Sequence, residues 1–162
     1  MEIVMGLLLA AVVGVVPMVV YALVLWWFDR YEKEPLGLLV AAFLWGAVPA
    51  VVFSLIVELA LDVPISQLVR PATSSLVQAA VIAPLAEEVF KAGALVLLFV
   101  FFRREIDSPL DGILYGGLVG FGFAAVENTF CFGSALVESG MGALVGMGFF
   151  RAFLFGLNHA LF

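Results

Sequence analysis

Charged side chains are scarce in this sequence. Only 12% of its 162 residues are Asp, Glu, Lys or Arg, which is about half the share found in a typical soluble domain. Hydrophobic residues make up 65% of the chain, and its mean hydropathy is +1.22. One small core cannot bury so much apolar surface, so most of it must face lipid. The composition therefore predicts an integral membrane protein.

Cysteine and basic residues are also rare. The single cysteine, Cys131, excludes a disulfide within the sequence. Seven Lys and Arg stand against thirteen Asp and Glu, which gives a formal net charge of −6. Binding of nucleic acid needs clustered basic residues, so this balance excludes a nucleic acid partner. The partner that the composition does predict is the lipid bilayer.

The N-terminal segment lacks the basic residues that begin a secretory signal. Its apolar run at 3–28 is longer than the apolar core of a signal peptide, so we expect a first spanning helix with a kink at Pro17. About 20 helical residues cross the hydrocarbon, and four later segments are also long enough. Spanning helices are predicted at 3–28, about 36–60, about 75–102, about 109–136, and between 141 and the end.

The predicted fold is therefore all-α: one polytopic transmembrane helix bundle of about five spanning helices, forming a single domain over residues 1–162. Residues 61–74, with Pro64 and Pro71, are expected to form a polar connection. The last predicted helix is interrupted by glycines, so we expect either that it is broken or that the natural chain continues past Phe162. These glycines are Gly140, Gly142, Gly146 and Gly148.

The start of the fourth helix is marked by three residues. Ser108 is predicted as the N-cap, Pro109 occupies the first helical position, and Asp111 stands three residues after the cap. This arrangement is typical of a capping box. The sequence therefore predicts a sharp helix start there.

The basic residues between the predicted helices alternate along the chain. Arg30 and Lys33 lie in the first loop, Arg103 and Arg104 lie in the third, and the second contains only Arg70. Because basic residues gather on the cytoplasmic side, the first and third loops are predicted to be cytoplasmic. The N-terminus is then outside, in a multi-pass protein of the cell membrane.

Six ionisable side chains interrupt the predicted spans. A charge at the bilayer centre costs roughly 2.5–3.5 kcal/mol on insertion scales, so such residues mark a functional site by default. They are Glu87, Glu88, Lys91, Glu127, Arg151 and His159.

The spacing of the charges on the third helix places Glu87 and Lys91 on one face, where they can pair. Glu88 is rotated by about 100° and points toward a different neighbour. Pro84 should kink the helix just before these residues. A buried ion pair that only fixes helix packing is the alternative interpretation of Glu87 and Lys91.

The predicted depths of Glu87 and Glu127 agree. At ~1.5 Å rise per residue, Glu87 lies about 24 Å from Arg103, and Glu127 lies about 24 Å from Asp111. The two carboxylates should therefore meet at one level of the membrane. An interhelical hydrogen-bond clamp is the alternative role for Glu127 and the neighbouring Asn128.

Five segments resemble the PrsW family of intramembrane proteases. Residues 83–91, APLAEEVFK, are similar to its EExxK motif, and residues 120–128, GFGFAAVEN, are similar to its FxxxEN block. Residues 158–162, NHALF, resemble the start of its histidine block. Residues 29–35 and 108–116 are also similar to the family. The resemblance covers most of the chain.

The resemblance implies cleavage of peptide bonds within or beside the membrane. The substrates it implies are membrane-anchored proteins, such as anti-sigma factors. The family is distantly related to the CAAX-processing proteases and is often labelled a metalloprotease family. A membrane protein or peptide substrate is therefore the expected partner.

Hydrolysis needs an activated water, and a carboxylate in an apolar pocket can act as its general base. We predict Glu87 as the base, acting on a water held by Glu127 or His159, with Glu88 as the second choice. This assignment takes the buried acids as catalytic residues of an intramembrane peptidase.

The remaining polar residues have supporting roles in this hypothesis. Lys91 would hold Glu87 in place, and His159 and Asn128 would donate hydrogen bonds to the oxyanion. Arg151 is expected to be a counter-ion.

A metal-dependent version uses the same side chains. Glu88, Glu127 and His159 would bind one divalent ion such as zinc, and Glu87 would remain the base. An HExxH motif is absent and the chain has one histidine, so a zinc site would be rich in oxygen ligands. The residues by themselves favour a metal-free site, whereas the family resemblance favours a metal.

Two functions outside catalysis also fit buried charges. Acids within membranes serve proton or ion pathways, although five helices without an internal repeat disfavour a transporter. A membrane-embedded scaffold or immunity-type binding protein is the third interpretation.

Overall fold

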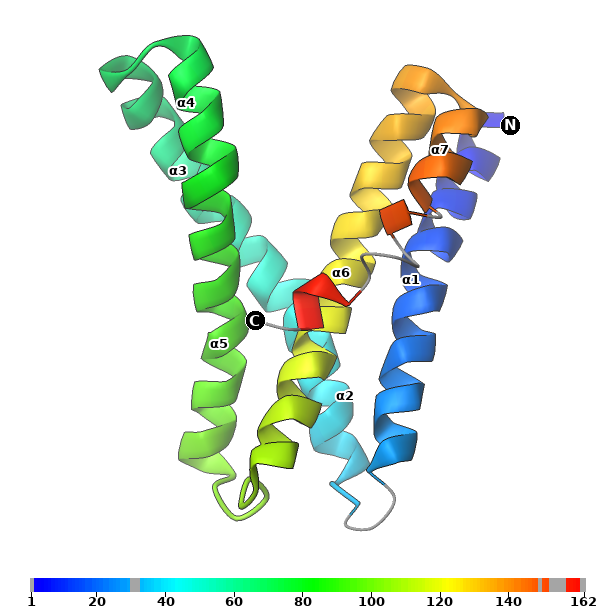
Figure 1. The fold of residues 1–162 in the computed structure, drawn as a ribbon, viewed down its shortest axis with the longest axis vertical. Helices are drawn as coiled ribbons and strands as arrows, with labels where there is room; N and C mark the ends of the chain where they lie inside the picture. Colours follow the sequence, from blue (N-terminus) through cyan, green and yellow to red (C-terminus); the bar gives the residue numbers. More distant parts are fainter. Residues whose placement is uncertain (1, 30–32, 149, 152–156, 161–162) are drawn as a thin grey trace.

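The structure is a computed structural model that describes residues 2–29, 33–148, 150–151 and 157–160. Within these ranges every regular element is a helix, which confirms the predicted all-α membrane bundle. The elements are α1 (Glu2–Phe28), α2 (Leu36–Trp45), η1 (Gly46–Ala50), α3 (Val51–Leu68), α4 (Pro71–Val77), η2 (Gln78–Ile82), α5 (Ala83–Phe101), α6 (Pro109–Ser139), α7 (Met141–Met147) and η4 (Asn158–Ala160) (Figure 1).

Three helical segments are long and apolar enough to cross a membrane: Val4–Phe28, Leu36–Leu68 and Pro109–Ser139. Residues 71–101 form a fourth helical run, in which the charges on α5 lower the apolar character. Many large aliphatic and aromatic side chains on these helices are exposed on the surface. Such a surface is expected of a bundle that lies in lipid.

Helix α6 forms the centre of the bundle. Its apolar window is 72% buried, against 17% for α1 and 22% for the α2–α3 segment. Where α6 crosses α2 and η1, a side chain at Gly122 would collide with the carbonyl of Phe43, and one at Gly46 with the carbonyl of Val119. Glycine at both positions lets the two backbones approach closely, as small residues do between membrane helices.

The predicted start of α6 is confirmed. The Ser108 hydroxyl accepts a hydrogen bond from the backbone N–H of Asp111 at 3.3 Å, and the Asp111 carboxylate accepts one from the backbone N–H of Ser108 at 2.8 Å. The capping box satisfies backbone donors that a helix start leaves without partners.

The predicted polar connection at residues 61–74 is wrong. Helix α3 continues to Leu68 with Pro64 inside it, and α4 already begins at Pro71. Residues around Pro64 are exposed, so the carbonyl that loses its partner is not enclosed by protein. Pro71 stands in the first turn of α4, where proline favours helix formation because its missing N–H is not needed.

The kink predicted at Pro84 corresponds to a change of helix type just before it. In η2 the backbone N–H of Ala83 bonds to the carbonyl of Gln78, five residues earlier, instead of four. Proline cannot donate to the preceding turn, and a π-helical turn changes the register of the ladder there. The side chains that follow on α5 are re-aimed by this turn.

The fifth predicted spanning helix is not continuous among the described residues. Helix α7 ends at Met147, Gly148, Phe150 and Arg151 are π-helical, and η4 contains three residues. Residues 152–156 lie outside the described part. Gly140, with φ of 80°, separates α6 from α7 in a backbone conformation that favours glycine. Of the two expectations for this segment, a broken helix is the one that the described residues show.

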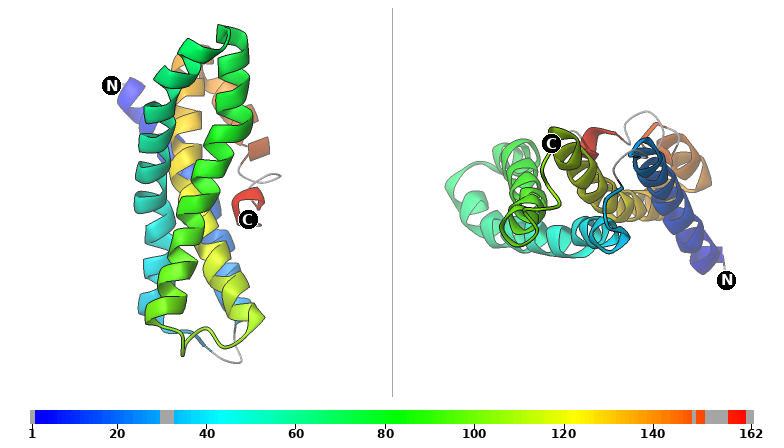
Figure 2. Two further views of the ribbon diagram at one scale, coloured as in Figure 1. Left: turned by 90° about the vertical axis from the view of Figure 1, so that its left-hand side faces the viewer. Right: turned by 90° about the horizontal axis from the view of Figure 1, so that it is seen from below.

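Two groups of helices diverge from one end of the molecule (Figure 1). Helices α3, α4 and α5 lie on one side, and α1, α6 and α7 lie on the other. They approach each other at the end that carries the α5–α6 loop. The side view shows α3 and α5 packed along each other, and η4 at mid-height beside α6 (Figures 1 and 2).

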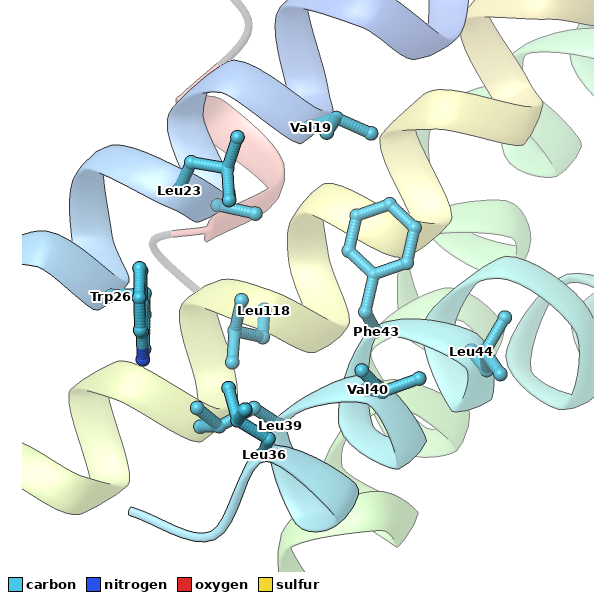
Figure 3. Close-up of a pocket in the computed structure, with 10 residues that line it drawn as sticks. Val19, Leu23, Trp26, Leu36, Leu39, Val40, Phe43, Leu44 and Leu118 are labelled. Carbon is cyan, nitrogen blue, oxygen red and sulfur yellow. The ribbon is translucent and has the colours of Figure 1, made fainter. Parts of the chain in front are cut away.

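An apolar hollow of about 350 Å³ lies between α1, α2 and α6. Figure 3 shows Val19 and Leu23 of α1 across from Val40 and Phe43 of α2, with Leu118 of α6 between them. The lining contains no ionisable side chain, so the hollow offers packing for hydrocarbon but no acid or base. The lining residues are Val19, Ala22, Leu23, Trp26, Leu36, Leu39, Val40, Phe43, Leu44 and Leu118.

Candidate active site

Helix α5 carries a completely buried lysine between two acids. The Nζ of Lys91 lies 2.8 Å from Oε1 of Glu88 and 3.7 Å from Oε2 of Glu87. The ammonium also lies 4.4 Å from the ring centre of Phe123 on α6. We expected Glu87 as the main partner of Lys91, but Glu88, one residue further, makes the close contact. All three residues lie on α5, and its helical spacing allows both the i,i+3 and the i,i+4 contact.

Helix α6 contributes Glu127 and Asn128, and both contact Arg151. The guanidinium of Arg151 forms an ion pair with Oε1 of Glu127 through Nη2, and its Nε donates to Oδ1 of Asn128 at 2.8 Å. Asn128 is buried. One guanidinium therefore fixes both Glu127 and Asn128, because its planar fork can donate in two directions.

The short element η4 places His159 between α5 and α6. Its Nε2 lies 2.9 Å from Oε2 of Glu127, and its Nδ1 lies 3.2 Å from Nζ of Lys91. The imidazole ring lies 5.6 Å from the ring of Phe123, tilted by 32°. A side chain at Gly120 would collide with the carbonyl of His159. Glycine at this position of α6 therefore lets η4 approach closely enough for both contacts.

Together these contacts join residues of four chain segments. The structure brings together all six intramembrane charges that the sequence singled out, and Asn128 with them. The order of contact is Glu87 and Glu88 to Lys91, Lys91 to His159, His159 to Glu127, Glu127 to Arg151, and Arg151 to Asn128.

Glu87 differs from Glu88 in how its carboxylate is engaged. Among the described residues, Glu87 makes only the 3.7 Å ion pair with Lys91, whereas Glu88 makes a hydrogen bond of 2.8 Å. The side chain of Glu87 is 19% exposed and that of Glu88 is 44% exposed. The charge of Glu87 also interacts with those of Glu127 and His159.

Glu127 keeps one acceptor that is not fully used. Its Oε2 is buried and has no well-directed hydrogen bond within the described residues, although Nε2 of His159 lies 2.9 Å away. The distance of 2.9 Å indicates that His159 and Glu127 attract each other. Because the ring N–H does not point directly at Oε2, this oxygen still has room for a second donor. A carboxylate oxygen has two lone pairs, so Oε2 can accept from a further group.

Glu58 is a charged residue of the site that sequence reasoning missed. It lies on α3, is half-buried, and interacts electrostatically with Glu127 and Glu87. Its backbone carbonyl accepts a hydrogen bond from Nε2 of Gln78 at 2.7 Å. Its carboxylate makes no hydrogen bond or ion pair with the described part of the chain. The signal was available, because Glu58 lies within a predicted span, as the other acids do.

The three candidate metal ligands do not fit a metal in this arrangement. No group of three His, Cys, Asp or Glu side chains converges on one point within the described residues. The oxygen of Glu88 and Nδ1 of His159 both face the ammonium of Lys91, and Glu127 faces Arg151. A divalent ion would therefore compete with Lys91 for Glu88 and for Nδ1 of His159, and with Arg151 for Glu127.

The profile of the family described as PrsW family intramembrane metalloprotease matches residues 34–162. Protease PrsW of Geobacillus kaustophilus (strain HTA426) is 31% identical over 149 residues, which are 92% of this chain and 60% of that relative. The chain thus spans 60% of the length of the curated relative it matches. No solved structure matches.

Proposed function

The chain belongs to the PrsW family of intramembrane metalloproteases, and from this premise we propose that it hydrolyses a peptide bond of a membrane-anchored protein. The observation that supports this most is that His159 of η4 lies between Lys91 of α5 and Glu127 of α6, while Glu87 forms an ion pair with the same lysine. Both acids are partly exposed, so water can reach them. Such a group has no obvious role in packing against lipid.

Glu87 is the base in this proposal. Its carboxylate takes a proton from water, and the hydroxide attacks the carbonyl carbon of the substrate. When the carbon–nitrogen bond breaks, the protonated Glu87 gives this proton to the leaving amine. Glu87 suits this role better than Glu88, because the lone pairs of Glu88 are turned to Lys91 at 2.8 Å.

The polar residues on α6 and η4 hold the water and the oxyanion. His159 would hold the attacking water, and Arg151 keeps the neighbouring carboxylate of Glu127 in place. Asn128, whose Oδ1 accepts from Arg151, keeps its Nδ2 as a donor for the oxyanion. The steps proposed here use no metal, and within the described residues the candidate ligands do not converge on one point.

The substrate class follows from the family resemblance. Membrane-anchored regulators such as anti-sigma factors are the substrates that the resemblance suggests. A spanning substrate must unwind near the cleaved bond, because a peptide bond inside a helix is shielded. The two diverging helix groups lie on either side of η4 (Figure 1), whose His159 contacts Lys91 of α5 and Glu127 of α6.

The test is cleavage of a reporter peptide by the purified chain in lipid nanodiscs. The reporter is a single membrane-spanning helix with a fluorophore and a quencher at its ends. Glu87→Gln should lose cleavage, whereas Glu138→Gln, the same change at an exposed position of α6, should keep it. Full activity in a folded Glu87→Gln protein would contradict Glu87 as the base. Proton flux into vesicles without any cleavage would favour the proton-pathway interpretation instead.

A further inference from the structure

The ammonium of Lys91 faces Nδ1 of His159, and the ammonium can act only as a hydrogen-bond donor. The ammonium of Lys91 has three N–H donors and no acceptor. Its Nζ lies 3.2 Å from Nδ1 of His159, within hydrogen-bonding distance. Nδ1 must therefore carry a lone pair on this side, because an N–H at Nδ1 would point at another donor.

The other nitrogen of the same ring leads to the same conclusion. Nε2 of His159 lies 2.9 Å from Oε2 of Glu127. An ionised carboxylate only accepts hydrogen bonds, so a lone pair on Nε2 would be repelled at this distance. The proton must then be on Nε2. The contacts with Lys91 and Glu127 come from different helices and select the same tautomer.

The orientation of the ring is equally constrained. Turning the imidazole by 180° would place carbon atoms against both the ammonium of Lys91 and the carboxylate of Glu127, and both contacts would be lost. The ring also lies along Phe123, and its backbone is held against Gly120. Few alternative positions therefore remain for the imidazole.

We propose that Lys91 is a positioning residue that holds His159 with its proton on Nε2, so that the imidazole is a hydrogen-bond donor and not a metal ligand. A metal binds a ring nitrogen through its lone pair, and the one lone pair of this tautomer is directed at Lys91. The inference disagrees with the metalloprotease description of the family. Only its catalytic meaning, an Nε2–H donor beside the water, rests on the proposed function.

The chain offers a direct test, because it contains one histidine. Protein labelled with ¹⁵N-histidine in nanodiscs gives one pair of ring nitrogen signals. In the wild-type protein Nε2 should appear protonated and Nδ1 unprotonated, because Nδ1 faces the ammonium of Lys91 and Nε2 faces Glu127. A proton on Nδ1 of the wild-type protein would overturn the proposal.

Variants at Lys91 test whether this residue is the cause. Lys91→Met should shift the Nδ1 signal, because Nδ1 loses its donor, and Lys91→Arg should move the signal back, because a guanidinium also only donates. If Lys91→Met does not fold, Glu88→Gln with Lys91→Met removes both partners of the close pair and should show the same shift. Ring signals equal to the wild type in the folded variant would refute the role of Lys91.

Zinc provides the third measurement. Adding zinc to the wild-type protein should leave both ring signals unchanged, whereas a shift typical of coordination would overturn the inference. Cleavage is measured separately on the same samples. A protein with the expected tautomer that cleaves no reporter supports the inference and contradicts the proposed function. A protein that cleaves the reporter only with zinc bound at His159 contradicts the inference and supports the proposed function.

Discussion

The ammonium of Lys91 lies 2.8 Å from the carboxylate of Glu88, at a point where the lysine is completely buried. This pair separates two acids that are adjacent in the sequence. Glu88 neutralises a buried cation, and Glu87 keeps most of its lone pairs for other partners. The two acids should therefore respond differently to the same substitution.

The first prediction compares Glu87→Gln with Glu88→Gln. Glu88→Gln should lower the free energy of unfolding by about 1.5–3 kcal/mol, the usual contribution of a hydrogen bond to a charged group. Glu87→Gln should lower it less, because its contact with Lys91 is 3.7 Å long, but should reduce cleavage by about 100-fold or more. Thermal unfolding in detergent and reporter cleavage measure the two effects. Equal stability loss in both variants would contradict the assigned pairing.

The second prediction concerns Arg151. Arg151→Met removes the ion pair with Glu127 and the hydrogen bond to buried Asn128, so the protein should lose roughly 3–5 kcal/mol. Arg151→Lys should recover only part of this, since an ammonium lacks the planar fork that reaches both groups. Thermal unfolding of the three proteins checks the order. A lysine variant as stable as the wild type would show that charge alone suffices.

The third prediction concerns Glu58. Its carboxylate repels those of Glu127 and Glu87, and it has no hydrogen bond or ion pair among the described residues. Glu58→Gln should therefore leave the protein as stable as the wild type or more stable, by up to about 1 kcal/mol, because a charge in the span is removed. The measurement is thermal unfolding beside reporter cleavage. A loss of stability would reveal a favourable contact of this carboxylate.

The fourth prediction concerns the loop that joins α1 and α2. The buried hydroxyl of Tyr115 donates a hydrogen bond of 2.7 Å to buried Glu34. Burial raises the pKa of Glu34 above 4.5, and the bond from Tyr115 opposes this shift. A raised pKa in the folded state means that its contribution to stability is full below 4.5 and is lost as the pH rises through the folded pKa.

Stability should therefore fall as the pH rises from about 4 through the folded pKa of Glu34. In Glu34→Gln this part of the pH dependence should disappear. Tyr115→Phe should cost about 1–3 kcal/mol at neutral pH, because a buried carboxylate loses its donor, and less at low pH. Unfolding temperatures across this range test all three proteins. A Glu34→Gln protein with the wild-type profile would refute the assignment.

The fifth prediction concerns orientation. The α5–α6 loop and the start of α2 lie at one end of the bundle, and the α3–α4 turn lies at the other (Figure 1). We expect the first end to be cytoplasmic because it carries Arg103, Arg104 and Lys33. In a Cys131→Ser background, cysteine at Arg104 should react only from inside, and cysteine at Arg70 only from outside. The reverse labelling would invert the topology. Arg30, which also supported this topology, lies outside the described residues.

The properties that depend on neighbouring residues could be predicted from the sequence. Apolar content and span length depend on composition alone, so the membrane bundle followed from them. The capping box at Ser108 and Asp111 needs only residues three positions apart. The group of buried acids followed from the cost of a charge in lipid, which applies to each residue separately.

Long-range contacts decided what the sequence could not. Whether Pro64 and Pro71 break or permit a helix depends on whether the freed backbone groups are enclosed. Helical spacing allows both Glu87 and Glu88 to reach Lys91, and only the side-chain conformations in the structure make the Glu88 contact the closer one. Helical spacing gives only the average direction of a side chain.

The position of His159 shows most clearly how long-range contacts decided the site. Element η4 lies against Gly120, far from it in sequence, and only this packing puts the imidazole between Lys91 and Glu127. No local pattern encodes the distance between segments that fold back on each other. The residues of the site were visible in the sequence, and their partners were decided by tertiary packing, because partners depend on which backbones can approach closely.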